Sequence, residues 1–448
     1  MADKNTPYPL KDNGIVKTIA NYMKIKYIGD RGICPCPFCK DKGNNFVISE
    51  KEEKFRCFSC GESGDKIDFV AKFKHITKED AYKELGIKIE KNPVDEKIKE
   101  ELYKINNEAG KYFNTLLKNN KQASKYLSDR ELDKKTVNHF GLGYSGTQKN
   151  DLYLHLKRMG FSNDMLIKSG LIGKSKYGKY YDKFVNRIMF PIFDTKNNLV
   201  GFGGRVLDDS KPKYLNSPAS EIFDKSMTLY GYNLASKTQF DGMLICEGYM
   251  DVIALHKNGF DCATASLGTA FNQEHAEMLK RIKDKVYVCF DGDEAGTKAK
   301  LKAIPKLRFS DLDVVIINTS PYKDPDDFIK SLGKEEFSKR MEDAENSYHF
   351  EIRIIRENSE NLDDFKKEVA KLMLKSTEIE INNYKDAYYQ IISEIPFEEQ
   401  LSETQEADLV IPITNDMIYG VEDNYVEENQ NKDDSLLQML DDYDIDIR

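Results

Sequence analysis

The sequence lacks the features of a secreted or membrane protein. Among its 448 residues, no apolar run approaches the roughly 20 residues that span a bilayer, and residues 1–13 contain no apolar signal core. These absences predict a cytoplasmic chain with no membrane partner. A Walker A loop is also missing, because Gly173-Lys174-Ser175 is not preceded by the required glycine five residues earlier. We find no internal repeats.

Length and charge say more about organisation. With 40% hydrophobic and 32% charged residues, a chain of this length is expected to form two or three globular domains. Residues 421–448 hold ten acidic residues against two basic ones, whereas residues 101–187 hold seventeen basic residues against eight acidic ones. This segregation favours a polyanionic partner for the basic part. A lysine-rich composition imposed by an AT-rich genome would give the same excess, so charge alone does not establish a polyanionic partner.

The eight cysteines are unevenly distributed. Five lie within Cys34–Cys60, and the other three, Cys246, Cys262 and Cys289, have apolar surroundings. Without an export signal the chain is expected to stay reduced, so a cysteine cluster indicates metal binding rather than disulfides.

The spacing within the cluster is that of a zinc ribbon. Cys36 and Cys39 form one pair, Cys57 and Cys60 form the second, and seventeen residues separate the pairs. The intervening FVISE and KFRCF alternate like the strands of a hairpin that would join the pairs. Four thiolates leave no position for water, so we expect one structural Zn²⁺. Cys34 could replace Cys36, but the regular length of the knuckle favours Cys36.

The pattern along the chain predicts a mixed α/β (α+β overall) protein. Between about 240 and 320, apolar strands at Met243–Cys246, Cys262–Ala265, Val286–Phe290 and Val314–Asn318 alternate with amphipathic helices, which indicates parallel β-α units. The expected parts are a zinc domain at 1–90, a charged linker at 91–104, a basic region at 105–238, the alternating region at 239–332, charged helices at 333–404 and a disordered acidic tail at 405–448.

Acidic residues follow the ends of these strands. They are Glu247, Asp251, Asp291, Asp293, Asp324 and Asp326. Because the carboxyl ends of parallel strands meet at one edge of a sheet, we expect these side chains to converge. Crowded carboxylates are stable around a hard divalent cation, and Mg²⁺ fits best. Single Asp residues after strands are also common turn and N-cap residues, but the three motifs together favour a metal site.

These motifs resemble a known family. EGYMD, DGDEAG and KDPDDF resemble the TOPRIM domain of DnaG-type primases, topoisomerases and some nucleases. The preceding NRIMFPIFD, GFGGRVL, PKYLNSP and IFDKSMTLYG resemble the polymerase domain of bacterial DnaG-type primases, and CPFC with CFSCG resembles their zinc domain. The resemblance covers roughly residues 10–330, in the family order.

The resemblance implies a DNA primase, which makes RNA primers from ribonucleoside triphosphates on single-stranded DNA. It makes Glu247 the central catalytic acid, with Asp291 and Asp293 holding Mg²⁺ or Mn²⁺ and the other three acids completing the cluster. It also implies a ridge that holds template and nucleotide phosphates, formed by Arg130, Arg187, Arg205, Lys213, Tyr214, Asn216 and Lys225. Arginine and lysine suit phosphates, and Tyr214 can stack on a base. The alternative for each basic residue is a solvated surface charge.

The chain departs from the family pattern at several points. Cys39 stands where many relatives have His, and Glu131 replaces a usual Gly after Arg130. Cellular relatives continue into a helicase-binding domain, whereas this chain closes with charged helices and the acidic tail, so contact with a replicative helicase stays open. Residues 435–445 could form a short docking helix, although disorder is the safer expectation.

Two other functions remain alternatives. One is a TOPRIM-containing nuclease or topoisomerase-like enzyme, and the other is a non-catalytic single-stranded-DNA-binding replication factor. The PKYLNSP and GFGGR stretches argue against the first alternative. The second would leave six carboxylates together without a cation, which would destabilise the fold.

Overall fold

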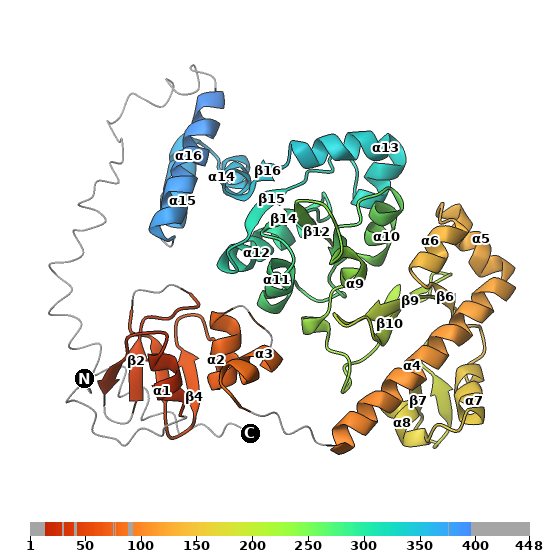
Figure 1. Ribbon diagram of the computed structural model, residues 1–448. Helices are drawn as coiled ribbons and strands as arrows, with labels where there is room; N and C mark the ends of the chain where they lie inside the picture. Colours follow the sequence, from red (N-terminus) through yellow and green to blue (C-terminus); the bar gives the residue numbers. More distant parts are fainter. Residues whose placement is uncertain are drawn as a thin grey trace. The chain divides into compact units, whose positions relative to one another are not determined.

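The computed structural model describes residues 14–28, 31–39, 43–74, 76, 78–87, 93–374 and 376–395 (Figure 1). The described chain is mixed α/β, as expected, and forms two compact units. The first runs to Ile354 and includes Thr377–Ile379, and the second contains Ile355–Ser376 and the described residues from Glu380 on. Within the described ranges, no helix combines the length and apolar character needed to cross a membrane. The acidic tail and its possible docking helix lie outside these ranges.

The N-terminal part of the first unit is a small antiparallel sheet with three short helices. Its strands are hydrogen-bonded in chain order: β1 (Lys26–Ile28), β2 (Arg31–Cys34), β3 (Phe46–Ser49), β4 (Lys54–Cys57) and β5 (Ser63–Gly64). The expected hairpin is β3–β4, in which Phe46 lies opposite Cys57. The helices are α1 (Ile15–Ala20), α2 (Lys66–Phe73) and α3 (Lys78–Glu84). The first helix ends at Ala20, and the chain then turns into β1.

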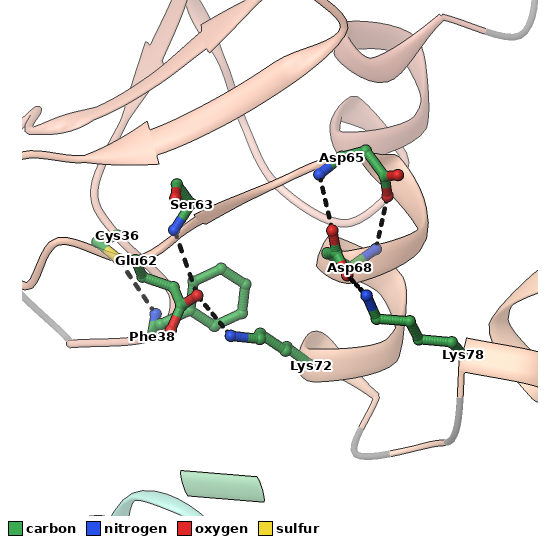
Figure 2. Close-up of polar contacts among 8 residues, drawn as sticks. All are labelled: Cys36, Phe38, Glu62, Ser63, Asp65, Asp68, Lys72 and Lys78. Carbon is green, nitrogen blue, oxygen red and sulfur yellow. Dashed lines mark hydrogen bonds and ion pairs between the residues drawn. The ribbon is translucent and has the colours of Figure 1, made fainter. Parts of the chain in front are cut away.

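Aromatic packing and helix capping hold this part together. Phe46 stacks on Phe55 with ring centroids 4.9 Å apart, and both rings contact Phe69 of α2. Figure 2 shows the start of α2, where the Asp65 carboxylate accepts hydrogen bonds from the N–H groups of Ile67 (2.7 Å) and Asp68 (2.9 Å). The Asp68 carboxylate accepts in return from the Asp65 N–H (3.1 Å). This reciprocal capping satisfies free donors at the start of the helix.

Two ion pairs flank this helix start. Lys72 pairs with Glu62, and Lys78, the first residue of α3, pairs with Asp68 (Figure 2). The Asp68 carboxylate therefore serves both the capping box of α2 and the contact with α3. Residues after the second cysteine pair are thus fixed by local polar contacts rather than by hydrophobic packing alone.

The charged segment that we expected to be a linker at 91–104 is helical from Pro93. It forms the first turns of α4 (Pro93–Asn119), which packs against β6 and β10. Proline is well tolerated in the first turn of a helix, where its missing N–H has no intrahelical partner. Leu102, Ile105 and Ala109 are completely buried at helical spacing. The dense charge in the sequence conceals this narrow apolar stripe, because the charged residues occupy the remaining faces.

A second, antiparallel sheet carries the glycine-rich segment GFGGR. Its order is β11 (Tyr214–Asn216), β10 (Leu199–Val206), β9 (Arg187–Phe193) and β6 (Gly143–Tyr144). Strand β10 contains all of this segment and pairs antiparallel with both β9 and β11. A side chain is excluded at Gly203, because a Cβ atom at this position would lie 2.4 Å from the Tyr249 ring.

Short helices and a hairpin surround this sheet. They are α5 (Lys121–Asp129), α6 (Lys134–His139), α7 (Asp151–Arg158), α8 (Asn163–Lys168), β7 (Ile172–Lys174), β8 (Tyr180–Asp182), η1 (Lys225–Met227) and α9 (Tyr232–Ala235). Strands β7 and β8 pair only with each other.

The third sheet is the expected parallel one. Its order is β13 (Ala263–Ala265), β12 (Gly242–Cys246), β14 (Lys285–Val288), β15 (Asp313–Ile316) and β16 (Glu345–Asn346). The first four strands are mutually parallel, and β16, which we did not expect, pairs antiparallel at the edge. The connecting helices are α10 (Tyr249–Lys257), α11 (Gln273–Lys280), α12 (Glu294–Phe309) and α13 (Pro325–Glu342), the last kinked at Gly333.

Two hydrophobic cores cover the two faces of the parallel sheet. Leu244 and Tyr287 belong to a core shared with β9, in which Phe190 stacks on Tyr249 at 4.9 Å. Ile245 and its neighbours belong to the other core, under α11 and α12. The first core therefore ties the antiparallel sheet to the parallel one and fixes how their functional edges meet.

The charged region after the parallel sheet is helical, as predicted. It contains α14 (Ser347–Asn358), α15 (Leu362–Met373) and α16 (Glu378–Glu394). In the second unit, Phe365 of α15 stacks on Tyr388 of α16 with centroids 5.5 Å apart.

Candidate metal centres and phosphate-binding ridge

Four cysteine thiols meet at the end of the zinc-ribbon sheet. The Sγ atoms of Cys36, Cys39, Cys57 and Cys60 all lie within 4.8 Å of one another, and those of Cys39 and Cys57 are 3.7 Å apart. Zn–S bonds of about 2.3 Å imply a tetrahedral edge of about 3.8 Å, so this donor set fits Zn²⁺. Cys34 lies in β2 outside the cluster, which decides the open choice in favour of Cys36.

The thiols have different proton affinities. Burial raises the pKa of Cys36, and it raises the pKa of Cys60 to about 12. Burial also acts upward on Cys57, but hydrogen bonds from the backbone of Cys60 and Ser59 outweigh it and lower the pKa of Cys57. Cys57 is therefore the thiol that most readily becomes a thiolate, the form that binds metal.

The acids gather at the carboxyl end of the parallel sheet, as predicted. Glu247 directly follows β12, and its Oε1 accepts a hydrogen bond from the N–H of Asp291, which follows the neighbouring β14, at 3.1 Å. Asp251 interacts electrostatically with Asp324, Asp291 and Asp326, and Asp291 with Asp293. All six predicted acids therefore belong to one acidic cluster.

Three of these acids also cap helices. Asp293 is the N-cap of α12 and accepts from the Gly296 N–H at 2.9 Å, while Asp324 caps α13 through the Asp327 N–H at 2.8 Å. Asp251 accepts from the Gly248 N–H at 3.0 Å at the start of α10. The capping interpretation and the metal interpretation are thus compatible. Each cap occupies one carboxylate oxygen and fixes the direction of the other.

Burial and mutual repulsion raise the proton affinity of the cluster. The pKa of Asp291 rises to about 6, first through burial and then through the charges of Glu247 and Asp324. The pKa of Asp251, which is only 7% exposed, lies well above its usual range for the same reasons. A cation among these carboxylates would oppose both effects.

The acids do not yet form a closed ligand set. Among the residues that the structure describes, the four cysteines are the only group of three or more candidate ligands brought together closely enough to hold a metal ion. The carboxylates fit Mg²⁺ or Mn²⁺ by chemical type, and they face a common region, but closing on an ion would require side-chain adjustment.

Part of the predicted ridge lies beside the acidic cluster. Arg130 Nη1 is 3.7 Å from Asp326 Oδ2. Lys213 is exposed, and the nearby charge of Arg205, followed by burial and the charges of Lys323 and Arg130, lowers its pKa. Several positively charged side chains therefore lie close together beside the acids, and a bound phosphate would offset their mutual repulsion.

Aromatic rings hold the central arginine of the ridge. Arg205 Nη1 donates to the Tyr214 hydroxyl at 2.7 Å, and its guanidinium lies over the rings of Tyr126 and Tyr214 at 5.7 and 5.3 Å. Tyr214 in turn stacks on Tyr249 at 5.9 Å. The expected base-stacking face of Tyr214 is thus partly used within the protein.

The other predicted ridge residues make main-chain contacts. Arg187 is buried, and its Nη1 donates to the carbonyls of Gly204 and Pro212, both at 3.0 Å. Asn216 donates to the Leu267 carbonyl and accepts from the Tyr249 hydroxyl, both at 2.7 Å. In this structure Arg187 and Asn216 therefore support the ridge from within. Lys225 opens η1, and its carbonyl contacts His275 Nε2 at 2.9 Å.

Sequence reasoning missed several residues of the site. Lys300 is buried beneath the acids, Lys323 interacts electrostatically with both Asp291 and Lys213, and Tyr126 contacts both Arg130 and Arg205. A signal existed for Lys323, which is part of KDPDDF. For Lys300 the only signal is its place two turns after Asp293 in α12.

Family comparisons agree with this geometry. Residues 9–101 match the CHC2 zinc finger, residues 112–236 match the N-terminal domain of the DNA primase catalytic core, and residues 244–329 match a Toprim-like domain. This combination defines a zinc-finger protein with a Toprim-containing primase core.

Individual relatives specify the family within this class of proteins. The DNA primase of Clostridium acetobutylicum is 39% identical over 397 residues, which cover 85% of this chain and 66% of the relative. The DNA primase of Aquifex aeolicus is 35% identical, with 77% of this chain and 70% of the relative covered. The chain belongs to the DnaG-type DNA primase family, and it spans about two thirds of the length of these relatives.

Solved structures show the same fold. The zinc-binding and RNA polymerase domains of the Aquifex aeolicus primase match with a TM-score of 0.58 at 30% identity, over 87% of this chain and 96% of that one. A DnaG primase catalytic domain bound to single-stranded DNA matches with a TM-score of 0.58 at 30% identity, over 65% of this chain and 98% of that one.

Proposed function

We propose that this chain is a DNA-dependent RNA polymerase that synthesises short RNA primers on single-stranded DNA from ribonucleoside triphosphates. One observation supports this most strongly. The hydrogen bond that joins Glu247 to the Asp291 main chain unites the acids of two strands, while Arg130 contacts Asp326 and Lys213 interacts with Asp324 in the same cluster. Acids for a divalent cation and cations for phosphates are the two requirements of nucleotidyl transfer.

The residues divide this work between them. Glu247, Asp291 and Asp293 would hold Mg²⁺ or Mn²⁺, which supplies charge neutralisation at the triphosphate and activation of the attacking 3′-hydroxyl. Glu247 has one oxygen engaged by the Asp291 N–H, so its carboxylate is oriented before any ligand arrives. Asp251, Asp324 and Asp326 add negative charge behind these three.

The ridge would orient the phosphates. Lys213 is the most accessible of its cations, and Arg205 is held rigidly between Tyr126 and Tyr214, so less side-chain freedom is lost when phosphate binds. Arg130 would exchange its contact with Asp326 for a phosphate oxygen. Arg187 and Asn216 would keep the backbone of the ridge in place.

The zinc ribbon would bind the template. A structural Zn²⁺ held by the four cysteines would fix the ends of β2–β5, and Arg56 and Phe58 on the adjoining surface offer a cation and an exposed ring for single-stranded DNA. The proposal also places this work at the cytoplasmic replication fork, in contact with a replicative helicase. The matches to the primase catalytic core and to DNA primases favour it over the nuclease and binding-protein alternatives.

Primer synthesis tests the proposal directly. Zinc-loaded protein, single-stranded templates, labelled ribonucleotides and Mg²⁺ or Mn²⁺ should yield short RNA from the wild type and none from Asp291→Ala. Asp284→Ala is the matched control, because Asp284 is a surface acid paired with Lys280 outside the cluster. Equal activity of wild type and Asp291→Ala would refute the assignment, and nicking of supercoiled DNA would favour the nuclease alternative.

A further inference from the structure

A buried lysine lies beneath the acidic cluster. Lys300 is only 5% exposed, and its Nζ donates a hydrogen bond to the main-chain carbonyl of Asp291 at 3.0 Å. It stands two turns after Asp293, the N-cap of α12. Helical side chains lean toward the N-terminus of their helix, so Lys300 reaches back toward the loop that carries the acids.

This contact completes the fixation of the Asp291 main chain. The Asp291 N–H donates to Glu247, its carbonyl accepts from Lys300, and the following Gly292 N–H donates to the Lys323 carbonyl at 2.7 Å. The loop is closely packed as well, since a Cβ atom on Gly296 would lie 2.1 Å from the Asp291 carbonyl oxygen. Any change at Lys300 is therefore felt at the position of Asp291.

The charge of Lys300 needs compensation. Burying an ammonium group without a partner is strongly unfavourable. Burial lowers the pKa of Lys300, the carboxylates of Glu247 and Asp291 favour its charged form, and the charge of Arg353 opposes it. Two predicted metal ligands thus offset the burial of this cation, and by the same interaction it offsets part of their negative charge.

We propose that Lys300 is an internal cation of the acidic cluster. It is a positioning residue that fixes the Asp291 main chain and, through its charge, weakens the binding of divalent cations by Glu247 and Asp291. A fixed positive charge close to both carboxylates keeps them compatible with each other before an ion binds, and it repels the ion once bound. The inference rests on the proposed function, because it assumes that these acids bind a divalent cation.

The charge and the hydrogen bond can be separated by two substitutions. Lys300→Gln removes the charge and retains an amide N–H donor, one bond shorter than the lysine chain, whereas Lys300→Met removes both charge and donor. If the charge acts as proposed, both variants bind the ion more tightly, by about tenfold for one unit charge acting in a partly buried site. If Lys300 acted only through its hydrogen bond to the Asp291 carbonyl, neither variant would bind the ion more tightly than the wild type.

Mn²⁺ titration followed by electron paramagnetic resonance measures this without catalysis. Zinc-loaded wild type, Lys300→Gln and Lys300→Met are titrated with MnCl₂ in the absence of nucleotide. Lys298→Gln is the matched control, since Lys298 lies on the same helix, is exposed and pairs with Glu294. We expect this control to stay within about twofold of the wild type, because exposed charges are well screened.

The same titration separates failure of this inference from failure of the proposed function. Wild-type binding that is lost in Glu247→Gln but unchanged in Lys300→Gln would overturn the role of Lys300 and leave the metal site intact. Wild-type binding that ignores Glu247→Gln, or no binding at all, would overturn both. A thermal melt identifies a misfolded Lys300→Met, in which case the polar Lys300→Gln decides alone.

Discussion

The two candidate metal centres differ in how far the protein alone assembles them. In the zinc ribbon, four Sγ atoms already lie within 4.8 Å of one another. At the end of the parallel sheet, the six acids influence each other electrostatically, but among the described residues they do not form a comparable ligand group.

Charge explains the difference. A protonated thiol is neutral, so cysteines can approach one another without a metal, and the raised pKa values of Cys36 and Cys60 keep them in that form. Ionised carboxylates repel one another, and the pKa of Asp291 is raised first by burial and then by the charges of Glu247 and Asp324. The ribbon is therefore prepared by packing, whereas the acids are oriented by capping bonds and need a cation among them to close into a ligand set.

The largest expected effect is loss of the ribbon. Cys57→Ser removes the thiol that most readily ionises, so Zn²⁺ should be released and the first 90 residues should lose their fold, since structural zinc contributes about 10 kcal/mol or more in small zinc domains. Zinc content by a colorimetric chelator and protease resistance of this part measure the effect. Cys34→Ser is the control and should retain the metal, because Cys34 is buried in β2 outside the cluster. Equal zinc loss in both variants would contradict the assignment of Cys36.

The next effect concerns the acidic cluster. Glu247→Gln keeps an oxygen to accept from the Asp291 N–H but removes the negative charge, so primer synthesis should fall at least about a hundredfold while template binding stays nearly unchanged. Labelled-primer assays and fluorescence anisotropy with single-stranded DNA give the two readouts. A parallel loss of DNA binding would mean that Glu247 supports structure rather than chemistry.

Much of this comparison could be predicted from the sequence. The cysteine spacing identifies the ribbon because a tetrahedral metal imposes it, and the acids are identifiable because parallel strands end at one edge. The acids converge because the strands that they follow are neighbours in the sheet, as the pairing of β12 with β14 confirms. Local sequence patterns were therefore sufficient to predict features that depend only on neighbouring elements of the chain.

The remainder depends on contacts between distant segments. Nothing in the sequence shows that Arg187 donates to the carbonyls of Gly204 and Pro212, because that requires the pairing of β9 with β10. From the sequence alone, Lys300 is expected to be a surface lysine, and its burial follows only from the packing of α12 on the sheet. The helical nature of 93–104 was hidden for a different reason, since Leu102 is the one residue of 94–104 that is buried, and it stands among many charges.

Asp182 tests whether burial alone can raise a carboxyl pKa as much as the acidic cluster does. It is 4% exposed in β8, and its oxygens accept from the N–H groups of Leu152 and Tyr153, both at 2.9 Å. Burial raises its pKa to about 6, with a smaller contribution from Asp151. Its folded pKa thus exceeds its unfolded value near 3.9, so its protonation adds stability as the pH falls through 6.

The expected size is about 1 kcal/mol between pH 7 and pH 5. The difference in free energy of unfolding between wild type and Asp182→Asn, measured by urea denaturation across this range, should change by that amount in favour of the wild type at low pH. Asp194→Asn is a control in an exposed turn, where Asp194 accepts from the Lys196 N–H. A pH-independent difference for Asp182→Asn would show that the neighbouring backbone donors already keep this carboxylate charged.

The smallest effect concerns the residue next to Arg130. Glu131 has a φ of +60°, the left-handed conformation that glycine adopts without steric cost, and its N–H bonds to the Ser128 carbonyl at 2.8 Å to close α5. Glu131→Gly should therefore stabilise the helix end by about 0.5 kcal/mol, less the weak surface pair with Lys257 at 3.7 Å. Glu131→Ala loses the pair and keeps the strain, so it should be the less stable variant in urea denaturation. If Gly and Ala proved equally stable, the left-handed turn would not be what favours glycine here. The Arg130–Asp326 contact, which joins the ridge to the acidic cluster, would then not depend on the left-handed conformation of the residue after Arg130.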